Sequence, residues 1–190
     1  FIYDPIPLII IRNIFTKKEN SEILSEAIKN KSYFKTAKIM DKNTSKNYRN
    51  NMVSSYDNVY SKDRTKSKLL ETINKYFINQ KFMNVLSSFI YPINLIRDTN
   101  THETQVSRYG DQGQEYKYHI DSFGGDVRLI TLVYYFNKEP KKYKGGEIQF
   151  TRSPISNGVI IDKNETPITI TPENNMMVIF GSKIPHTVLP

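Results

Sequence analysis

The sequence predicts an α+β fold, with helices in the first half of the chain and a double-sheet jelly roll (a double-stranded β-helix) in the second. Two observations predict this order. Apolar residues recur at helical spacing in the first half, whereas short alternating or wholly apolar runs, separated by turn residues, fill the second half. Helices followed by strands are typical of α+β domains, and many short strands in succession are typical of jelly rolls.

Two helices are expected in the first half, after a buried strand within residues 5–15. Thr16 and Glu19 have the spacing of a capping box, in which each side chain binds the backbone N–H of the other residue. The first helix therefore begins there and runs to about Asn30. A second amphipathic helix is expected over residues 63–89, where apolar side chains recur every three or four positions.

The second half contains the expected strands of the jelly roll. The segment 127–136 is apolar on both faces, which predicts a central strand, and 174–180 runs from a turn into a buried strand. Seven or eight short strands are expected in all, among them 103–109, 116–121, 127–136, 144–150, 167–171 and 174–180. A chain of 190 residues predicts one domain, with 1–98 as mostly helical support and loop and 99–190 as the jelly-roll core.

Composition excludes several classes of function. The chain has no cysteine, which rules out a disulfide scaffold, thiol catalysis and cysteine metal sites, and favours a reducing compartment such as the cytoplasm. No apolar run approaches the ~18 residues of a membrane span, and no signal peptide is visible after Phe1, so no membrane partner is expected. The net charge of +8 suits nucleic acid, but the charges are spread along the chain, which favours an ordinary solvated surface.

Histidine is scarce, and two of the three histidines stand in a pattern that suits a metal. His119 lies two positions before Asp121, so in a strand both side chains point to the same face. A jelly roll can return His186 to that face from the end of the chain. Two imidazoles and one carboxylate with three open positions form the facial triad of non-haem Fe(II) oxygenases, whereas zinc would leave one open position. A His-x-Asp pair alone also arises by chance at ordinary turns.

Four stretches together resemble a known family. They are "QVSRYGDQGQEYKYHID", "RLITLVYYFN", "KGGEIQF" and "ITPENNMMVIFGSKIPHTVLP". In order and content they are similar to the 2-oxoglutarate- and Fe(II)-dependent dioxygenases of the prolyl 4-hydroxylase type, over about 85 residues. The matching elements are Tyr109-Gly110, His119-Ile120-Asp121, Arg128 to Asn137, Gly145-Gly146-Glu147, Phe180 and His186.

The resemblance implies a catalytic iron site and its cofactors. His119, Asp121 and His186 would be the catalytic metal ligands, Fe(II) the metal, 2-oxoglutarate the cosubstrate and dioxygen the oxidant, with ascorbate as an accessory reductant. Tyr109 falls where the family has a tyrosine that binds the far carboxylate of 2-oxoglutarate. The resemblance therefore implies an oxidoreductase that hydroxylates its substrate.

Substrate contacts and two departures also follow from the resemblance. Tyr116 and Arg128 fall where peptide prolyl hydroxylases hold their substrate. Ile148 stands where the family often has a threonine near the cosubstrate. The family also places a Lys or Arg after the distal histidine to pair with the cosubstrate carboxylate, but this sequence ends four residues past His186, at Pro190. We expect the natural protein to continue; otherwise that cation comes from elsewhere.

The function expected from the sequence is hydroxylation of peptidyl proline, with free amino acids and other small molecules as further substrate candidates. A nucleic-acid demethylase of the same chemistry and a metal-free jelly-roll binding module are the alternatives. Residues 41–62 are polar and aperiodic, which predicts a loop. We expect this loop to set selectivity, to be mobile without ligand and to approach the metal when substrate binds.

Overall fold

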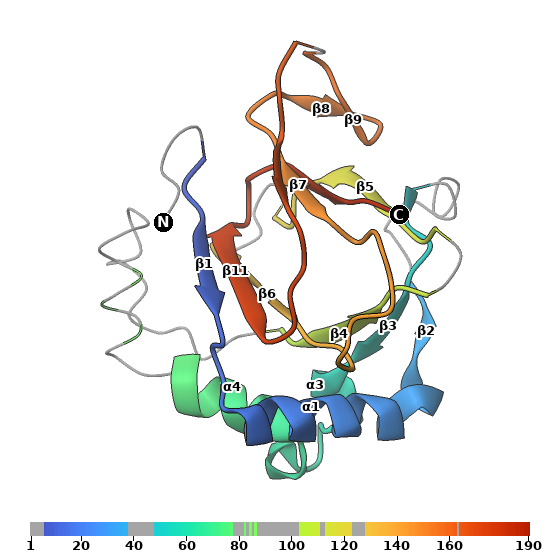
Figure 1. Ribbon diagram of the computed structural model, residues 1–190, viewed down its shortest axis with the longest axis vertical. Helices are drawn as coiled ribbons and strands as arrows, with labels where there is room; N and C mark the ends of the chain where they lie inside the picture. The colour runs from blue at the N-terminus through green and yellow to red at the C-terminus, as the bar shows by residue number, and fades with distance from the viewer. Residues whose placement is uncertain are drawn as a thin grey trace. The chain divides into compact units, whose positions relative to one another are not determined.

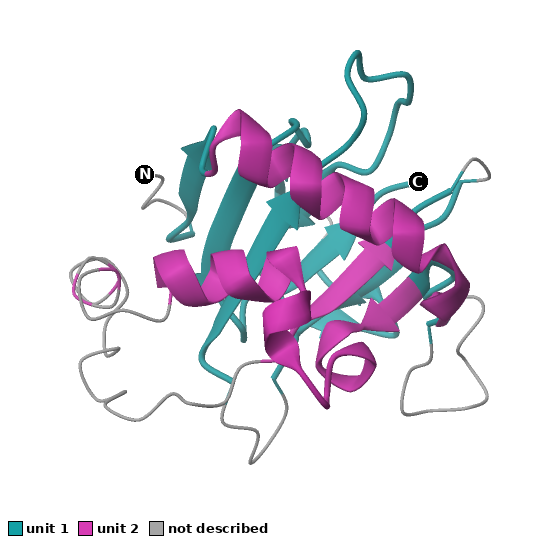
Figure 2. Cartoon of the chain, turned by 90° about the horizontal axis from the view of Figure 1, so that it is seen from below, with its two compact units in different colours: residues 1–14, 36–52, 108–190 teal, residues 15–35, 53–107 magenta. Residues whose placement is uncertain are grey.

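The computed structural model describes residues 6–37, 48–77, 82, 84, 86, 103–110, 113–122, 128–162 and 164–190. The chain divides into two compact units, each made of segments that are separated in sequence (Figure 2). The first unit comprises Phe1–Ile14, Thr36–Met52 and Arg108–Pro190, and the second comprises Phe15–Lys35 and Val53–Ser107. The N-terminal strand segment therefore belongs with the β-rich second half of the chain. The organisation as one domain with a boundary near residue 98 stays a prediction.

The first unit contains two antiparallel sheets (Figure 1). One has the strand order β1 (Ile9–Arg12), β11 (Met176–Gly181), β6 (Ile130–Tyr135). The other has the order β10 (Ile168–Ile170), β7 (Ile148–Phe150), β12 (His186–Val188), β5 (Tyr116–His119). A separate hairpin joins β8 (Ile155–Ser156) to β9 (Val159–Ile160). Neighbouring strands in these sheets come from distant parts of the sequence, as a jelly roll requires.

The core of this unit is formed by inward-facing residues of both sheets. Phe150 on β7 and Phe180 on β11 are fully buried and meet edge to face, with ring centroids 4.8 Å apart. The other buried members of the cluster are Ile6, Leu8, Ile148, Ile170, Met176 and Val178. Burying an aromatic or large aliphatic side chain of this kind stabilises the fold by about 1.5–3 kcal/mol. This apolar layer fixes the two sheets that carry the site described below.

The positions of β11 and β6 partly correct the sequence expectation. β11 is buried along nearly its whole length and lies between two partners, as the apolar run 174–180 predicts. Among the described strands, β6 lies at an edge of its sheet, where Leu132 is 38% exposed, so the expectation of a central strand was wrong there. An apolar run on both faces does not distinguish a central strand from an edge strand whose outer face stays partly exposed.

The second unit contains the expected helices. α1 (Lys17–Lys29) begins with the predicted capping box: Thr16 Oγ1 accepts from the backbone N–H of Glu19, and Glu19 Oε2 accepts from that of Thr16. A 3-10 helix, η1 (Asn30–Tyr33), follows it. No helix in the described part of the chain is both long and apolar enough to cross a bilayer.

The second helix begins later than predicted, at Lys68 instead of residue 63. Asp63 caps a 3-10 helix, η2 (Arg64–Lys66), and Ser67 Oγ then accepts from the backbone N–H of Leu70 at the start of α4 (Lys68–Phe77). Two caps within five residues break the chain into two helices because each diverts backbone N–H groups to a side chain. Most of the expected helix beyond Phe77 lies outside the described residues.

The prediction of a loop over residues 41–62 is wrong for residues 52–59, which form a strand and a short helix. β3 (Met52–Ser55) leads into a short helix, α3 (Tyr56–Val59), whose first turn is capped by Ser55. Tyr56 is 1% exposed, so tertiary burial of one aromatic ring orders a segment that lacks apolar periodicity. β3 pairs with β2 (Lys35–Thr36) and β4 (Gln105–Arg108) in the order β2-β3-β4. Residues 41–47 lie outside the described residues.

The Gly-Gly turn before β7 explains a motif of the sequence. Gly145 and Gly146 have φ angles of 80° and 78°, which residues with a Cβ rarely adopt. A Cβ on Gly145 would also lie 2.1 Å from the carbonyl oxygen of Pro190. The backbone N–H of Gly146 donates to Leu189 O at 3.2 Å. The turn therefore holds β7 close to the end of β12, the strand that carries His186.

Candidate metal centre

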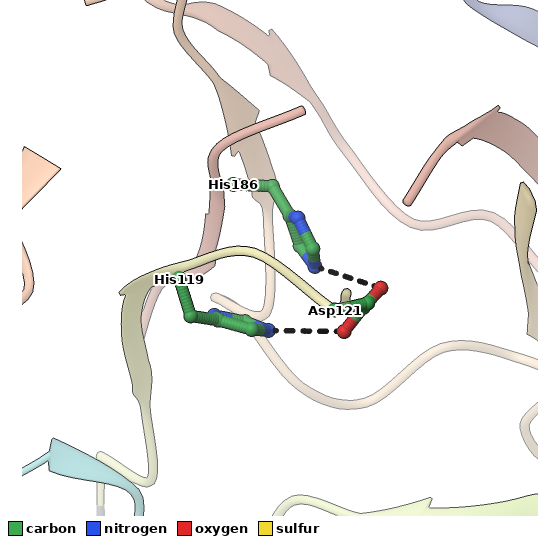
Figure 3. A group of neighbouring side chains, drawn as sticks. All are labelled: His119, Asp121 and His186. Atoms are coloured by element: carbon green, nitrogen blue, oxygen red, sulfur yellow. Dashed lines mark ion pairs between the residues drawn. The ribbon is translucent and has the colours of Figure 1, made fainter. Parts of the chain in front are cut away.

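Three side chains of the first unit converge on one point, as the sequence predicted. His119, Asp121 and His186 each present one donor atom, and these atoms lie within 4.8 Å of one another. The Nε2 atoms of His119 and His186 are 3.6 Å from Asp121 Oδ1 and Oδ2, respectively (Figure 3). The two imidazole ring centroids are 4.2 Å apart. This spacing suits a single cation bound by all three residues.

Strand pairing brings the two histidines together. β5 and β12 are antiparallel neighbours, and His186 is the direct register partner of His119. Asp121 follows the end of β5, where its backbone N–H donates to Ser182 O at 2.9 Å. This bond fixes the chain just after the strand, so the carboxylate reaches the same space as both imidazoles.

Each histidine is held in the tautomer that a metal ligand needs. His119 Nδ1 is 2.8 Å from Lys117 O, and His186 Nδ1 is 2.9 Å from Ile184 O. A carbonyl oxygen only accepts, so each Nδ1 carries the proton and donates it. Each Nε2 then keeps a free lone pair that faces Asp121. Histidine ligands commonly bind a metal with one nitrogen and donate from the other in this way.

The carboxylate is oriented by a neighbouring hydroxyl. Thr131 on β6 donates from Oγ1 to Asp121 Oδ2 at 2.6 Å, a charge-assisted hydrogen bond. Thr131 Oγ1 also lies 3.1 Å from Ser182 Oγ, and Ser182 is 1% exposed. β6 belongs to one sheet and β5 to the other, so the acidic ligand is supported from the sheet opposite the strand that presents it.

Burial keeps both histidines neutral. It lowers the pKa of His119 well below its usual value, and the nearby His186 and Arg49 lower that pKa further. Burial also lowers the pKa of His186, although the Asp121 carboxylate opposes the shift. Two neutral imidazoles and one carboxylate leave a bound divalent cation with a net charge of +1, which suits an anionic chelating molecule at the open positions.

The other residues predicted for the site have different surroundings. Burial raises the pKa of the Tyr109 phenol to about 12, and the charges of Arg49 and Asp121 also act on it, so it lies in the field of the triad. The Tyr116 ring stacks on His119, with centroids 3.4 Å apart and an interplanar angle of 15°. Arg128 is exposed just before β6.

Two neighbours of the site were missed from the sequence. Tyr135 lies on the same inward face of β6 as Thr131, and its hydroxyl has no hydrogen-bond partner among the described residues although it is buried. Arg49 places its guanidinium 4.4 Å above the Tyr116 ring. The alternation of β6 from Thr131 could have identified Tyr135, but Arg49 lies in a segment without periodicity.

The surroundings fit a divalent metal together with an anionic molecule. The donor set of two imidazoles and a carboxylate is that of the iron facial triad. A buried hydroxyl without a partner is costly, about 1–3 kcal/mol, and Tyr135 would recover that cost by donating to a bound ligand. The Tyr109 phenol interacts electrostatically with both Tyr135 and Asp121.

Comparison with curated proteins gives a relative of the PKHD hydroxylase type. The chain is 29% identical over 181 residues to an uncharacterized PKHD-type hydroxylase of Synechocystis sp., covering 94% of this chain and 55% of the relative. The chain thus spans just over half the length of this curated relative.

Solved structures of prolyl hydroxylases share the fold. The Pseudomonas putida prolyl-4-hydroxylase matches with a TM-score of 0.65 at 15% identity, covering 98% of this chain and 86% of that one. The Trichoplax adhaerens prolyl hydroxylase, solved in complex with a peptide fragment of the hypoxia inducible factor oxygen degradation domain, matches with a TM-score of 0.67 at 18% identity, covering 98% and 78%. The predicted α+β fold with a jelly-roll core is confirmed by these likenesses.

The family model for the 2OG-Fe(II) oxygenase superfamily matches residues 104–190. This segment contains His119, Asp121 and His186, the residues that converge in the structure. The sequence resemblance is thereby confirmed for residues 104–190, the segment that matches the 2OG-Fe(II) oxygenase superfamily model.

Proposed function

We propose that this protein is an Fe(II)- and 2-oxoglutarate-dependent hydroxylase of the prolyl 4-hydroxylase type, acting on peptidyl proline. The observation that carries the proposal is the convergence of two tautomerically fixed histidines and one oriented carboxylate on a single point. The superfamily match supports iron, 2-oxoglutarate and dioxygen as the partners of that site.

His119, Asp121 and His186 would hold the iron. The chemistry that iron, 2-oxoglutarate and dioxygen supply in such a site is hydroxylation of a C–H bond coupled to conversion of 2-oxoglutarate to succinate and carbon dioxide. The protein would contribute orientation, because Lys117 O and Ile184 O hold the imidazoles that would bind the iron.

Tyr135 and Tyr109 would bind the far carboxylate of 2-oxoglutarate. The unpaired Tyr135 hydroxyl on the inward face of β6 supports this role, and Tyr109 shares its surroundings. Both phenols have raised pKa values because they are buried, so both remain protonated donors at neutral pH. Tyr116 and Arg128 stay the proposed substrate contacts; Tyr116 is supported by its stacking on His119.

Peptidyl proline is the proposed substrate because the structurally similar Trichoplax adhaerens enzyme was solved with a peptide fragment. A cytoplasmic location is part of the same proposal and rests on the cysteine-free sequence.

A succinate-release screen tests the proposal. The protein would be supplied with Fe(II), 2-oxoglutarate and ascorbate, and proline-rich peptides, free amino acids and methylated oligonucleotides would be compared, with Asp121→Ala as the control. Release stimulated by proline peptides, with a mass gain of one oxygen atom on the peptide, is the expected result. Stimulation by oligonucleotides alone would indicate a demethylase, and failure to bind iron at all would indicate a metal-free binding module.

A further inference from the structure

A stack of three side chains connects the segment before β3 with the metal site. The guanidinium of Arg49 lies over the Tyr116 ring, 4.4 Å from its centroid, and the same ring stacks on the imidazole of His119, with centroids 3.4 Å apart. A cation over an aromatic face is attracted to the negative potential of the ring. Arg49 is thus placed one aromatic ring away from a proposed iron ligand.

Backbone and side-chain hydrogen bonds hold this cation in place. Arg49 forms an isolated antiparallel bridge with Tyr116, and its Nε donates to Asn51 Oδ1 at 2.8 Å. On either side, the Glu115 N–H donates to Asn50 Oδ1 at 2.6 Å and the Tyr48 hydroxyl donates to Tyr118 O. The segment is therefore fixed along β5 over several residues, and Arg49 is a positioned charge rather than a freely moving surface arginine.

The charge of Arg49 is not neutralised by any carboxylate among the described residues, since none of their ion pairs includes it. The side chain is half-buried, and the hydrogen bond to Asn51 uses only Nε. A guanidinium has five N–H donors in a planar fork that matches a carboxylate. The guanidinium also hydrogen-bonds with the Tyr116 side chain, and a fork of five donors has further N–H groups for an anion.

We assign the anion that Arg49 would meet to the substrate; the cosubstrate is the competing anion, because the charge of Arg49 also acts on Tyr109. The unpaired hydroxyl of Tyr135 belongs to β6, whereas Arg49 and Tyr116 lie along β5, in the other sheet of this unit. The cosubstrate, 2-oxoglutarate, has two carboxylate groups. One would bind the metal, and the other would accept from the Tyr135 hydroxyl. The Arg49 guanidinium beside Tyr116 would then bind the molecule that is hydroxylated.

We propose that Arg49 binds a carboxylate of the substrate, so that the enzyme selects a proline substrate that carries a negative charge close to the reacting ring. The inference rests on the proposed hydroxylase function. The carboxylate is either the C-terminal group of the proline itself or the side chain of a neighbouring acidic residue. Both sources present the same planar anion to the guanidinium.

The test measures binding in the absence of turnover. The full chain, loaded with Mn(II) and 2-oxoglutarate without dioxygen, would be titrated calorimetrically with two matched pairs of probes. Acetyl-Ala-Pro is compared with its C-terminal amide, and acetyl-Asp-Pro-amide with acetyl-Asn-Pro-amide. The wild type should bind the anionic member of at least one pair about tenfold or more tightly than its neutral partner, because a charge-assisted hydrogen bond contributes that much or more.

Arg49→Gln should abolish this preference, and Arg49→Lys, which keeps the charge but not the fork, should retain part of it. Arg12→Gln removes the same charge from an exposed ion pair with Glu173 and should leave the preference intact. Binding of 2-oxoglutarate and Mn(II) should be unchanged in Arg49→Gln, which also reports on its folding; if that variant does not fold, Arg49→Lys carries the comparison.

The proposal is overturned if the wild type shows no preference or binds no probe, if Arg49→Gln keeps the preference, or if its affinity for 2-oxoglutarate falls instead. Its failure is separable from failure of the hydroxylase function. Substrate binding is measured without dioxygen, whereas hydroxylase activity is measured by succinate release. A charge preference in binding without any succinate release would contradict the proposed hydroxylase function but not the role of Arg49.

Discussion

The substitution Thr131→Val tests how much the hydroxyl that orients Asp121 contributes to metal binding, while Asp121 itself stays in place. Valine has nearly the shape of threonine but lacks the hydroxyl that donates to Asp121 Oδ2 at 2.6 Å. A hydrogen bond to a charged group contributes about 1.5–3 kcal/mol, and every 1.4 kcal/mol is about tenfold in affinity. The Asp121 side chain is 25% exposed, so solvent replaces the bond only in part. We therefore expect Fe(II) to bind about tenfold to a hundredfold more weakly, in the range typical for loss of a residue that orients a metal ligand.

Anaerobic titration with Fe(II), or with Mn(II) as a stable substitute, measures the effect. Thr169→Val is the matched control, because Thr169 lies on β10 at the opposite edge of the four-stranded sheet from β5 and its hydroxyl accepts from Gln149. Thermal unfolding of the metal-free variants should be similar. Unchanged metal affinity in a folded Thr131→Val protein would refute the idea that this hydroxyl pre-orients the carboxylate.

Three further outcomes are expected. Asp121→Ala should abolish succinate release while circular dichroism shows an intact fold, because the residue serves the metal and not the apolar core; full turnover in this variant would contradict the assignment. The pKa values of His119 and His186 are lowered in the folded chain, so below about pH 6.5 the unfolded chain binds more protons and the metal-free protein should lose stability as the pH falls. Urea midpoints measured from pH 8 to pH 5 check this, and a flat profile would argue against burial of neutral imidazoles. Tyr135→Phe should weaken 2-oxoglutarate binding about tenfold and leave metal affinity unchanged, since it removes one donor to a carboxylate; equal losses for both ligands would indicate a general structural role.

The sequence was most informative where local rules decide the structure. The capping box at Thr16, the strand β5 and the buried run of β11 all depend on neighbours within a few residues, and all three are confirmed. The clustering of the histidines with Asp121 also followed from periodicity combined with the return of the chain in a jelly roll.

What the sequence did not reveal depends on contacts between distant segments. Tyr56 orders α3 through burial that no local pattern records, and the position of β6 beside β11 among the described strands is decided by pairing with a distant segment. Arg49 reaches the site only because its backbone bridges to Tyr116. Such placements are set by tertiary packing, which overrides local propensity.

Because His186 pairs directly with His119, a bound metal would also hold the strands β12 and β5 together, in addition to its chemical role. The two residues are distant in the sequence, and the cation would cross-link β12 to β5 much as a staple closes a long loop. Because side chains alternate along a strand, a slip of one residue would turn His186 to the other face and break the link. Metal binding therefore selects one register of the last strand, and its binding free energy adds to the folding free energy of the β-rich unit. Chelation should then loosen the last strand before it affects the rest of the sheet.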